Sequence, residues 1–335
     1  MTSIIMKEDA IRPRELFDEY LRLSREDVET FFSDQSAFQE VPCPACDDSR
    51  RDGGFEKLAF RYQVCAGCGS LYVSPRPRPK LVDEYYRRGK AVQFWTTHFY
   101  RETAEARREK IFKPRAMLVA ELLNRFGDRY AQSFADIGAG YGIFLEEVKE
   151  LGRFKTIRAI EPGPDLAAVC REKGFEVVEK PAENVGEGEC SSTFATAFEL
   201  LEHVYSPLEF LRAVRRIVNR DGLFLFTTLT VSGFDIQVLW DKSKSVYPPH
   251  HINLLSVDGM RRLVERSGFR LIELTTPGQL DVDIVANYVR DNPSTVLPRF
   301  VSSLLRAGET VRNDFQSFLS RNLLSSHIRV IASNP

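Results

Sequence analysis

The chain has 335 residues, 43% of them hydrophobic and 28% charged, and its net charge is −1 at pH 7. These values are ordinary for a soluble protein with one large and one small domain, and the charge provides no general attraction to nucleic acid or anionic lipid. No apolar run approaches the roughly 20 residues that span a bilayer, and the start of the chain lacks the features of a signal peptide, so we expect a cytoplasmic protein.

The first predicted element is a helix over residues 14–32, where Leu16, Tyr20 and Leu23 are among the apolar side chains at helical spacing. We therefore interpret residues 1–40 as a helical segment. The proline-rich stretch 75–80 interrupts regular structure and is interpreted as a hinge. Residues 81–115 mix aromatic and charged side chains and are expected to form a helical linker.

Four of the six cysteines fall within residues 41–80, as Cys43-x2-Cys46 and Cys65-x2-Cys68 with 18 residues between the pairs. In a reducing compartment two such pairs favour a metal over disulfides, and they can close a tetrahedral thiolate site for zinc. Four protein ligands leave no open position, so this zinc ribbon is expected to be structural. Four unrelated thiols, or an oxidised pair, are the alternative.

Six basic residues lie between Arg76 and Lys90, beside Tyr85 and Tyr86. Basic and aromatic side chains interleaved in this way can bind nucleic acid or a phosphorylated ligand. Acidic residues interrupt the block, which favours solvated helix faces whose aromatic side chains pack onto the main domain.

Strands and helices alternate from Ser133 onward, which predicts a doubly wound α/β fold with a parallel sheet between two layers of helices. A capping box with proline, Ser206-Pro-Leu-Glu209, starts a helix that runs to Val218. Further helices are expected at 260–266 and 297–322. The predicted strands are 134–137, 156–160, 176–179, 194–198, 223–228, 270–274 and 327–332.

A glycine-rich turn follows the first of these strands, in the sequence Asp136-Ile-Gly138-Ala-Gly140-Tyr-Gly142. Glycines let the backbone turn tightly and approach a ligand closely. Glu161 ends the next strand, where a carboxylate can accept both hydroxyls of a ribose. The turn departs from the dinucleotide-binding G-x-G-x-x-G pattern, because residue 143 is Ile.

This pattern, the FELLEHV segment at 198–204 and the Asp-Gly turn at 221–222 resemble the class I S-adenosylmethionine (SAM) methyltransferases over residues 110–275. The resemblance implies a Rossmann-like sheet of seven strands whose last strand is antiparallel. It implies a SAM-binding core at 116–275, an insertion or cap at 276–325 and a last strand within 326–335. The implied SAM-binding residues are Asp136, Gly138, Gly140, Gly142, Glu161, Pro162, Ala182, Glu183 and Glu199. Another nucleotide-binding Rossmann domain, or an inactive family member, is the alternative.

His203, His250 and His251 follow the fourth and fifth strands of the predicted sheet, where the site of an open α/β sheet lies. Each is a candidate catalytic base, and a packing or turn-stabilising role is the alternative. Tyr247 precedes the two adjacent histidines. That arrangement, behind a four-cysteine module, is similar to sugar C-methyltransferases of deoxysugar pathways, although the cysteine pairs are closer here and the large C-terminal domain of that group is absent.

The favoured function is therefore SAM-dependent methylation of a small molecule, a sugar or nucleotide-sugar in polysaccharide or natural-product biosynthesis. The alternatives are an RNA methyltransferase that holds its substrate with the zinc ribbon, and a non-catalytic adaptor on the same fold. The sequence leaves open whether oxygen, carbon or nitrogen accepts the methyl group.

Overall fold

The computed structural model describes residues 7–335, so the first six residues of the segment 1–40 lie outside the described part. The chain forms two compact units. The first contains the residues up to Ala104, Leu229–Gly259 and Thr275–Ile328, and the second contains Glu105–Thr228, Met260–Leu274 and Arg329–Pro335. Within residues 7–335, no helix has the length and apolar character that crossing a membrane requires.

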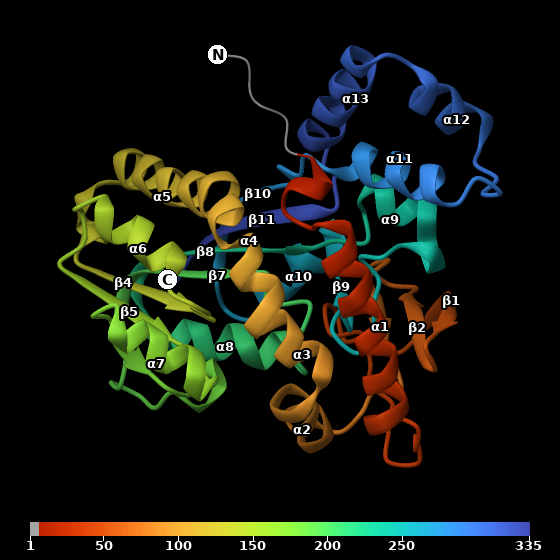
Figure 1. Cartoon of the computed structure of the whole chain (residues 1–335). Coiled ribbons are helices and arrows are strands. Elements are labelled where there is room, and N and C mark those ends of the chain that lie inside the picture. Colours follow the sequence, from red (N-terminus) through yellow and green to blue (C-terminus); the bar gives the residue numbers. More distant parts are fainter. Residues whose placement is uncertain (1–6) are drawn as a thin grey trace. The chain divides into compact units, whose positions relative to one another are not determined.

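The second unit is built on a seven-stranded sheet with the strand order β10-β11-β8-β7-β4-β5-β6 (Figure 1). Strands β4 to β8 pair in parallel. Backbone hydrogen bonds join Asn334 to Asp221 and Gly222, and Ser326 to Thr230, so β11 runs antiparallel to β8 as predicted. The strands are β4 (Ser133–Ile137), β5 (Thr156–Ile160), β6 (Glu176–Val178), β7 (Ser192–Phe198), β8 (Val218–Leu229), β10 (Arg270–Thr275) and β11 (His327–Ser333).

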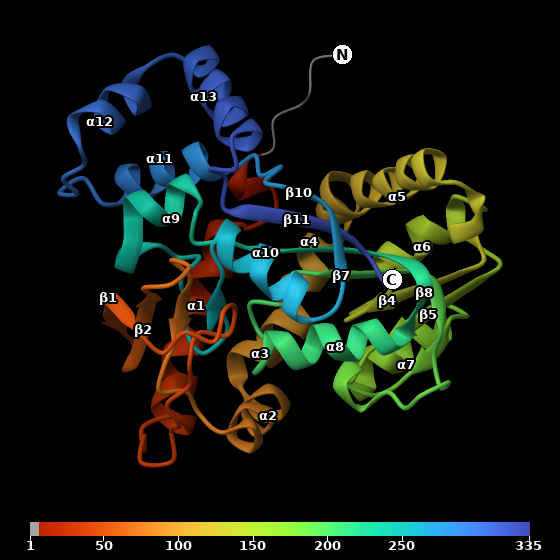
Figure 2. The same cartoon turned by 180° about the vertical axis from the view of Figure 1, so that it is seen from behind.

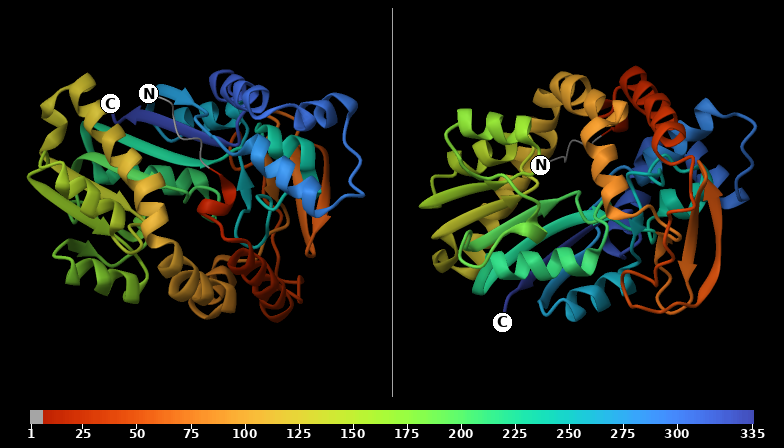
Figure 3. Two further views of the ribbon diagram at one scale, coloured as in Figure 1. Left: turned by 45° about the horizontal axis from the view of Figure 1, so that its top comes forward. Right: turned by 90° about the horizontal axis from the view of Figure 1, so that it is seen from below.

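Helices cover both faces of this sheet, with α5 and α6 on one face and α8 on the other (Figure 3). The α8 helix begins as its capping box predicts, because the Ser206 side chain accepts the Glu209 N–H at 3.4 Å. Its apolar positions, Phe210, Val214 and Ile217 among them, are buried. The helices are α5 (Lys113–Phe126), α6 (Ile143–Glu150), α7 (Pro164–Glu172), α8 (Pro207–Ile217) and α10 (Val257–Arg266).

The first unit contains an antiparallel sheet of four strands in the order β1-β2-β3-β9. Strand β9 lies about 180 residues after β3 in the chain, and its two residues pair with Leu71 and Tyr72. Sequence patterns give little indication of β1, β3 and β9, because β1 contains two glycines and the other two strands are very short. The strands are β1 (Arg51–Lys57), β2 (Phe60–Cys65), β3 (Leu71–Val73) and β9 (Asn253–Leu254).

The helices of the first unit include α1, which begins at Arg14 as predicted, and the pair α12 and α13, which replaces the single helix expected over 297–322. That long helix breaks at Ala307 and Gly308, both in extended backbone. The helices are α1 (Arg14–Phe31), α2 (Pro79–Arg88), α3 (Lys90–Phe94), α4 (Tyr100–Arg107, which runs into the second unit), α9 (Phe234–Leu239), α11 (Asp281–Asp291), α12 (Arg299–Arg306) and α13 (Glu309–Arg321).

The stretch at 75–80, which is expected to be a hinge, is held by several contacts. Gln39 and Arg76 exchange backbone hydrogen bonds of 2.8 and 2.9 Å. The Arg76 side chain is 1% exposed and donates to the Val73 carbonyl and to the Asn253 side chain. Pro79 begins α2, a position that suits proline because its missing N–H would have no partner there. The stretch is therefore anchored at Arg76 and helical from Pro79.

Candidate cofactor and metal sites

The carboxyl ends of β4, β5 and β7 meet at one edge of the large sheet. Ile137 in β4 lies opposite Ile160 in β5 and Ala197 in β7. The residues that follow, Gly138 and Glu161, therefore leave the sheet side by side. Ligand sites of open parallel sheets lie at this edge.

The turn after β4 requires glycine at three positions. Gly138, Gly140 and Gly142 have φ angles of +73°, +53° and +68°, which side chains with a Cβ rarely adopt. A Cβ on Gly138 would also lie 2.6 Å from the Leu200 side chain, whereas a Cβ on Gly140 would meet no atom within 4 Å. Gly138 thus serves the packing of the fold, while the space beside Gly140 is open to a ligand.

Glu161 is held at this turn by two backbone groups. One carboxylate oxygen accepts the Gly140 N–H and the other accepts the Gly163 N–H, each at 2.9 Å. Burial raises the pKa of the carboxyl, although both hydrogen bonds act to lower it. Each carboxylate oxygen keeps a further lone pair, so the group can still accept two hydroxyls. Pro162 lies between Glu161 and Gly163, and Pro164, the first residue of α7, favours the extended conformation of Gly163.

Asp136 is buried and is the residue before the last in β4. Its carboxylate accepts a 2.7 Å hydrogen bond from the Thr196 hydroxyl on β7. Burial raises the pKa of Asp136 to about 7, against the lowering effects of Thr196 and of the nearby Arg115 charge. A positively charged ligand beside the turn would therefore favour the ionised form of this carboxyl.

Glu199 follows β7 with a φ of +54° and is fixed by two partners that sequence reasoning missed. The Thr227 hydroxyl and the Arg115 guanidinium donate to the same carboxylate oxygen, at 2.6 and 2.9 Å. Arg115 also lies 4.3 Å from the centre of the Phe198 ring. Arg115 precedes Glu199 by 84 residues, so no local pattern indicates the pair.

Glu202 is a second carboxyl that the sequence did not single out. It is 1% exposed and accepts a 2.6 Å hydrogen bond from Thr228. Burial, with the nearby Glu199 charge, raises the pKa of Glu202 to about 8.

Two of the predicted cofactor contacts lie after β6. Ala182 is buried at the start of a short 3-10 turn, and Glu183 is exposed.

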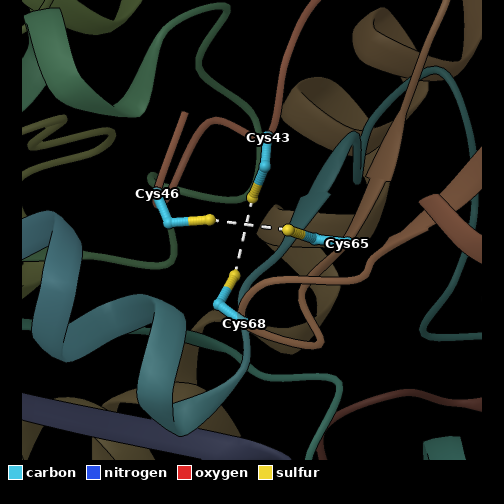
Figure 4. Close-up of side chains that lie close together, drawn as sticks. All are labelled: Cys43, Cys46, Cys65 and Cys68. Atoms are coloured by element: carbon cyan, nitrogen blue, oxygen red, sulfur yellow. Dashed lines mark hydrogen bonds between the residues drawn. The ribbon is translucent and has the colours of Figure 1, made fainter. Parts of the chain in front are cut away.

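In the first unit, the sulfurs of Cys43, Cys46, Cys65 and Cys68 converge on one point (Figure 4). The Cys43 and Cys68 sulfurs are 3.6 Å apart, and those of Cys46 and Cys65 are 3.5 Å apart. Zinc–sulfur bonds of about 2.3 Å in a tetrahedron give an edge of about 3.8 Å, whereas a disulfide needs about 2.05 Å. The four sulfurs therefore fit a tetrahedral metal ion.

The two cysteine pairs have the same backbone geometry. Asp47 donates to the Cys43 carbonyl and Gly69 to the Cys65 carbonyl, each at 2.8 Å. Asp47 and Gly69, four residues after the first cysteine of each pair, have φ angles of +68° and +71°. Backbone N–H groups also donate to the sulfurs, those of Ala45 and Cys46 to the Cys43 sulfur among them. Such bonds stabilise the negative charge of metal-bound thiolates.

Residues 106–274 match the family model described as a methyltransferase domain, which covers half of the chain. The chain belongs to this family. The predicted class I SAM methyltransferase and its seven-stranded α/β fold are thereby confirmed.

Curated relatives of this methyltransferase carry the name ubiquinone biosynthesis O-methyltransferase. The protein from Xanthomonas oryzae pv. oryzae is 31% identical over 117 residues, which are 31% of this chain and 46% of the relative, so the match spans less than half of the relative's length. The Colwellia psychrerythraea protein is 24% identical over 186 residues, 48% of this chain and 73% of the relative. A SAM-dependent methyltransferase structure from Clostridium acetobutylicum has a TM-score of 0.45 at 8% identity, covering 70% of this chain and 98% of its own.

In the first unit of the methyltransferase, His250 is buried against aromatic side chains. Its Nε2 lies 2.5 Å from the Tyr85 hydroxyl and 3.4 Å from the Ser24 hydroxyl. The Tyr20 ring packs on it with centroids 5.3 Å apart. Tyr85 thus belongs to a buried cluster of the first unit, whereas the aromatic residues of the basic block were expected to pack onto the main domain.

One hydrogen bond of His251 assigns the tautomer of its neutral ring. Its Nδ1 lies 2.7 Å from the Ser245 carbonyl oxygen, and because a carbonyl can only accept, Nδ1 carries the proton. The basic nitrogen of the neutral ring is therefore Nε2. The Tyr62 hydroxyl fixes the backbone by donating to the His251 carbonyl at 2.7 Å. The Tyr247 hydroxyl donates to the Leu21 carbonyl at 2.8 Å. The remaining candidate, His203, is half-buried and belongs to the second unit.

Proposed function

We propose that this methyltransferase transfers the methyl group of SAM to a small acceptor, a sugar or nucleotide-sugar in polysaccharide or natural-product biosynthesis. The observation that carries the SAM part is the anchored Glu161 carboxylate beside the open position at Gly140. In this proposal Glu161 accepts the ribose hydroxyls, and the turn 138–142 lies against the methionine part. Pro162, Ala182, Glu183 and Glu199 complete the cofactor contacts.

Methyl transfer is an in-line displacement in which the acceptor attacks the methyl carbon and the carbon–sulfur bond breaks. The chain's residues must align the acceptor and exclude water, and such alignment can lower a barrier by about 7–11 kcal/mol. The buried Asp136 carboxylate offsets positive charge on the bound ligand. When the acceptor is a hydroxyl, a neutral imidazole of His203, His250 or His251 removes its proton, with Tyr247 beside the adjacent pair. The tautomer of His251 favours that residue.

The proposal includes one structural zinc on Cys43, Cys46, Cys65 and Cys68, and a reducing, cytoplasmic location that keeps the thiols available. It also keeps the division predicted from the sequence: a helical segment at 1–40, the ribbon at 41–80, a linker at 81–115, the core at 116–275, a cap at 276–325 and the last strand at 326–335.

Several features of the block between Arg76 and Lys90 support a small acceptor over RNA. Arg76 is buried, Arg88 pairs with Glu84 at 2.9 Å, and Lys90 pairs with Glu26 at 3.0 Å. Paired or buried cations contribute little to binding a phosphate backbone, which relies on many exposed basic side chains.

A second small-molecule candidate is the hydroxyl of a phenolic compound, because the curated relatives are named as O-methyltransferases.

Methyl transfer from labelled SAM is expected with a sugar or nucleotide-sugar and not with RNA. A panel of nucleotide sugars, catechols and total RNA separates the candidates. Binding of a nucleotide sugar should depend weakly on salt, whereas RNA binding would weaken by orders of magnitude between about 50 and 200 mM salt. Steeply salt-dependent RNA binding together with RNA methylation would overturn the sugar assignment, and transfer to catechols alone would favour the phenolic one.

The base should be revealed by glutamine variants of His203, His250 and His251. At least one is expected to lower turnover at least about tenfold while SAM affinity and melting temperature stay close to wild type. The wild-type rate should rise through about pH 6 to 7, where a free imidazole loses its proton. His98→Gln is the matched control, because His98 is exposed in the helical turn Trp95–Phe99 and is not a candidate base. Wild-type turnover in all three variants would show that transfer relies on positioning or on another base.

A further inference from the structure

Helices α11, α12 and α13 follow one another in the first unit (Figures 1 and 2). Residues of these helices and of the segment between α11 and α12 line an open groove of about 590 Å³. Its apolar wall is formed by Ala286, Val289, Leu297 and Leu305. The volume lies within the range of small-molecule sites, which combine an apolar lining with a few polar groups. No sequence pattern indicated this groove, because α11 was not predicted and α12 and α13 were expected to be one helix.

Three guanidinium groups line the groove, from Arg290, Arg306 and Arg312. Arg290 has an ion pair with its neighbour Asp291 at 3.3 Å. Within residues 7–335, the side chains of Arg306 and Arg312 have no hydrogen-bond or ion-pair partner. Two cations thus border an apolar surface without a protein anion to neutralise them.

The lining of the groove contains little negative charge. Asp283 is the only acidic residue in the lining, and its carboxylate already accepts the Glu8 N–H at 2.9 Å and lies 3.9 Å from the Lys7 ammonium. From Asn292 to Gly308 the chain carries two arginines and no acidic residue. The net charge of the lining residues is therefore positive, which is complementary to an anion.

We propose that this groove binds an organic phosphate that carries an apolar group, a ligand that is separate from SAM and goes beyond the proposed methyl transfer. The phosphate would accept hydrogen bonds from Arg306 and Arg312, since guanidinium groups match phosphate oxygens in pairs. The apolar group would cover Val289, Leu297 and Leu305. A soluble molecule is favoured over a membrane surface because Val289, Leu297 and Leu305 line a concave groove. Val296 and Phe300 of the same region are exposed, and the vesicle experiment below tests them.

Calorimetric titration of the full chain with n-octyl phosphate tests this site. Octyl phosphate is expected to bind at least tenfold more tightly than inorganic phosphate, because the apolar wall is buried only by the chain-bearing ligand. Arg306→Gln and Arg312→Gln should each weaken it about tenfold. Arg299→Gln is the matched control: Arg299 is an exposed arginine of the same helix that does not line the groove, and its loss should leave binding unchanged.

Three results would overturn the proposal. No saturable binding of octyl phosphate is the first. The second is equal affinity for octyl and inorganic phosphate, or no loss in the Arg306→Gln/Arg312→Gln double variant, either of which means an adventitious anion only. The third is binding to phosphatidylglycerol vesicles that Arg299→Gln weakens as much as Arg306→Gln, which would indicate a membrane surface. SAM affinity and melting temperature of each variant show that it folds, and a failure of SAM binding in the wild type would contradict the proposed function without touching this site.

Discussion

Glu161→Ala is expected to weaken SAM binding at least about a hundredfold. The carboxylate is anchored by the Gly140 and Gly163 N–H groups and, in the proposed complex, accepts two ribose hydroxyls. A hydrogen bond to a charged group contributes about 1.5–3 kcal/mol, so losing two removes most of the affinity. Isothermal titration measures the change. Glu172→Ala, at an exposed position at the end of α7, is the control and should bind SAM like the wild type.

Two glycine variants separate the ligand site from the fold. In Gly140→Val the new side chain meets no protein atom within 4 Å at its Cβ, so SAM affinity should fall strongly while the melting temperature changes modestly from backbone strain. In Gly138→Ala the new Cβ would lie 2.6 Å from the Leu200 side chain. The main effect of this variant should therefore be a lower melting temperature. Unchanged SAM affinity in both Glu161→Ala and Gly140→Val would contradict the cofactor site.

The same titration has a defined pH dependence. Burial raises the pKa of Asp136 to about 7 in the ligand-free protein, and the positive charges of SAM favour the ionised carboxylate. Binding below pH 7 then requires loss of a proton, so affinity should rise with pH, by up to about tenfold per unit, and level above about pH 7. The range pH 5.5 to 7.5 keeps the SAM ammonium protonated. Asp136→Asn should flatten the profile, and an unchanged slope in that variant would exclude Asp136 as its source.

The parts of the site that the sequence predicts are those whose signal is local. The turn at 138–142 and Glu161 follow from glycines at a strand end and an acid at the end of the next strand. The partners that hold these residues in place cannot be predicted from such local patterns. Thr196 reaches Asp136 because β7 lies beside β4, and Thr227 reaches Glu199 because β8 lies beside β7. Strand order and register decide such contacts, and neither can be read from one segment alone.

The metal centre shows the same division. Cysteine spacing predicts the four ligands, because a metal site imposes its geometry on a short stretch of chain. The residues that support it come from far away. Ser256 donates to the Cys68 carbonyl, and its own backbone N–H donates to Ser70 beside the second pair. No pattern in residues 41–80 indicates that a segment near residue 255 completes this module.

Removal of zinc is expected to unfold the first unit's ribbon. Cys65→Ser should reduce the metal content from one zinc per chain to near zero, measured by elemental analysis, and should destabilise the protein by several kcal/mol, since structural zinc supplies much of the folding free energy of such modules. The full chain is the proper sample, because β9 pairs with β3 and belongs to the same sheet. Cys190→Ser, at a buried cysteine of the second unit, controls for the loss of a thiol and should retain one zinc.

SAM binding should persist in Cys65→Ser, because Asp136, Glu161 and Glu199 all belong to the second unit and none is a ligand of the metal. A closed site with four thiolates has no position for a reacting water, so zinc acts on the fold and not on the methyl-transfer step. Freshly purified protein without zinc would refute the metal assignment. A Cys65→Ser variant that folds and binds both substrates normally but turns over slowly would instead give the metal centre a direct part in the chemistry.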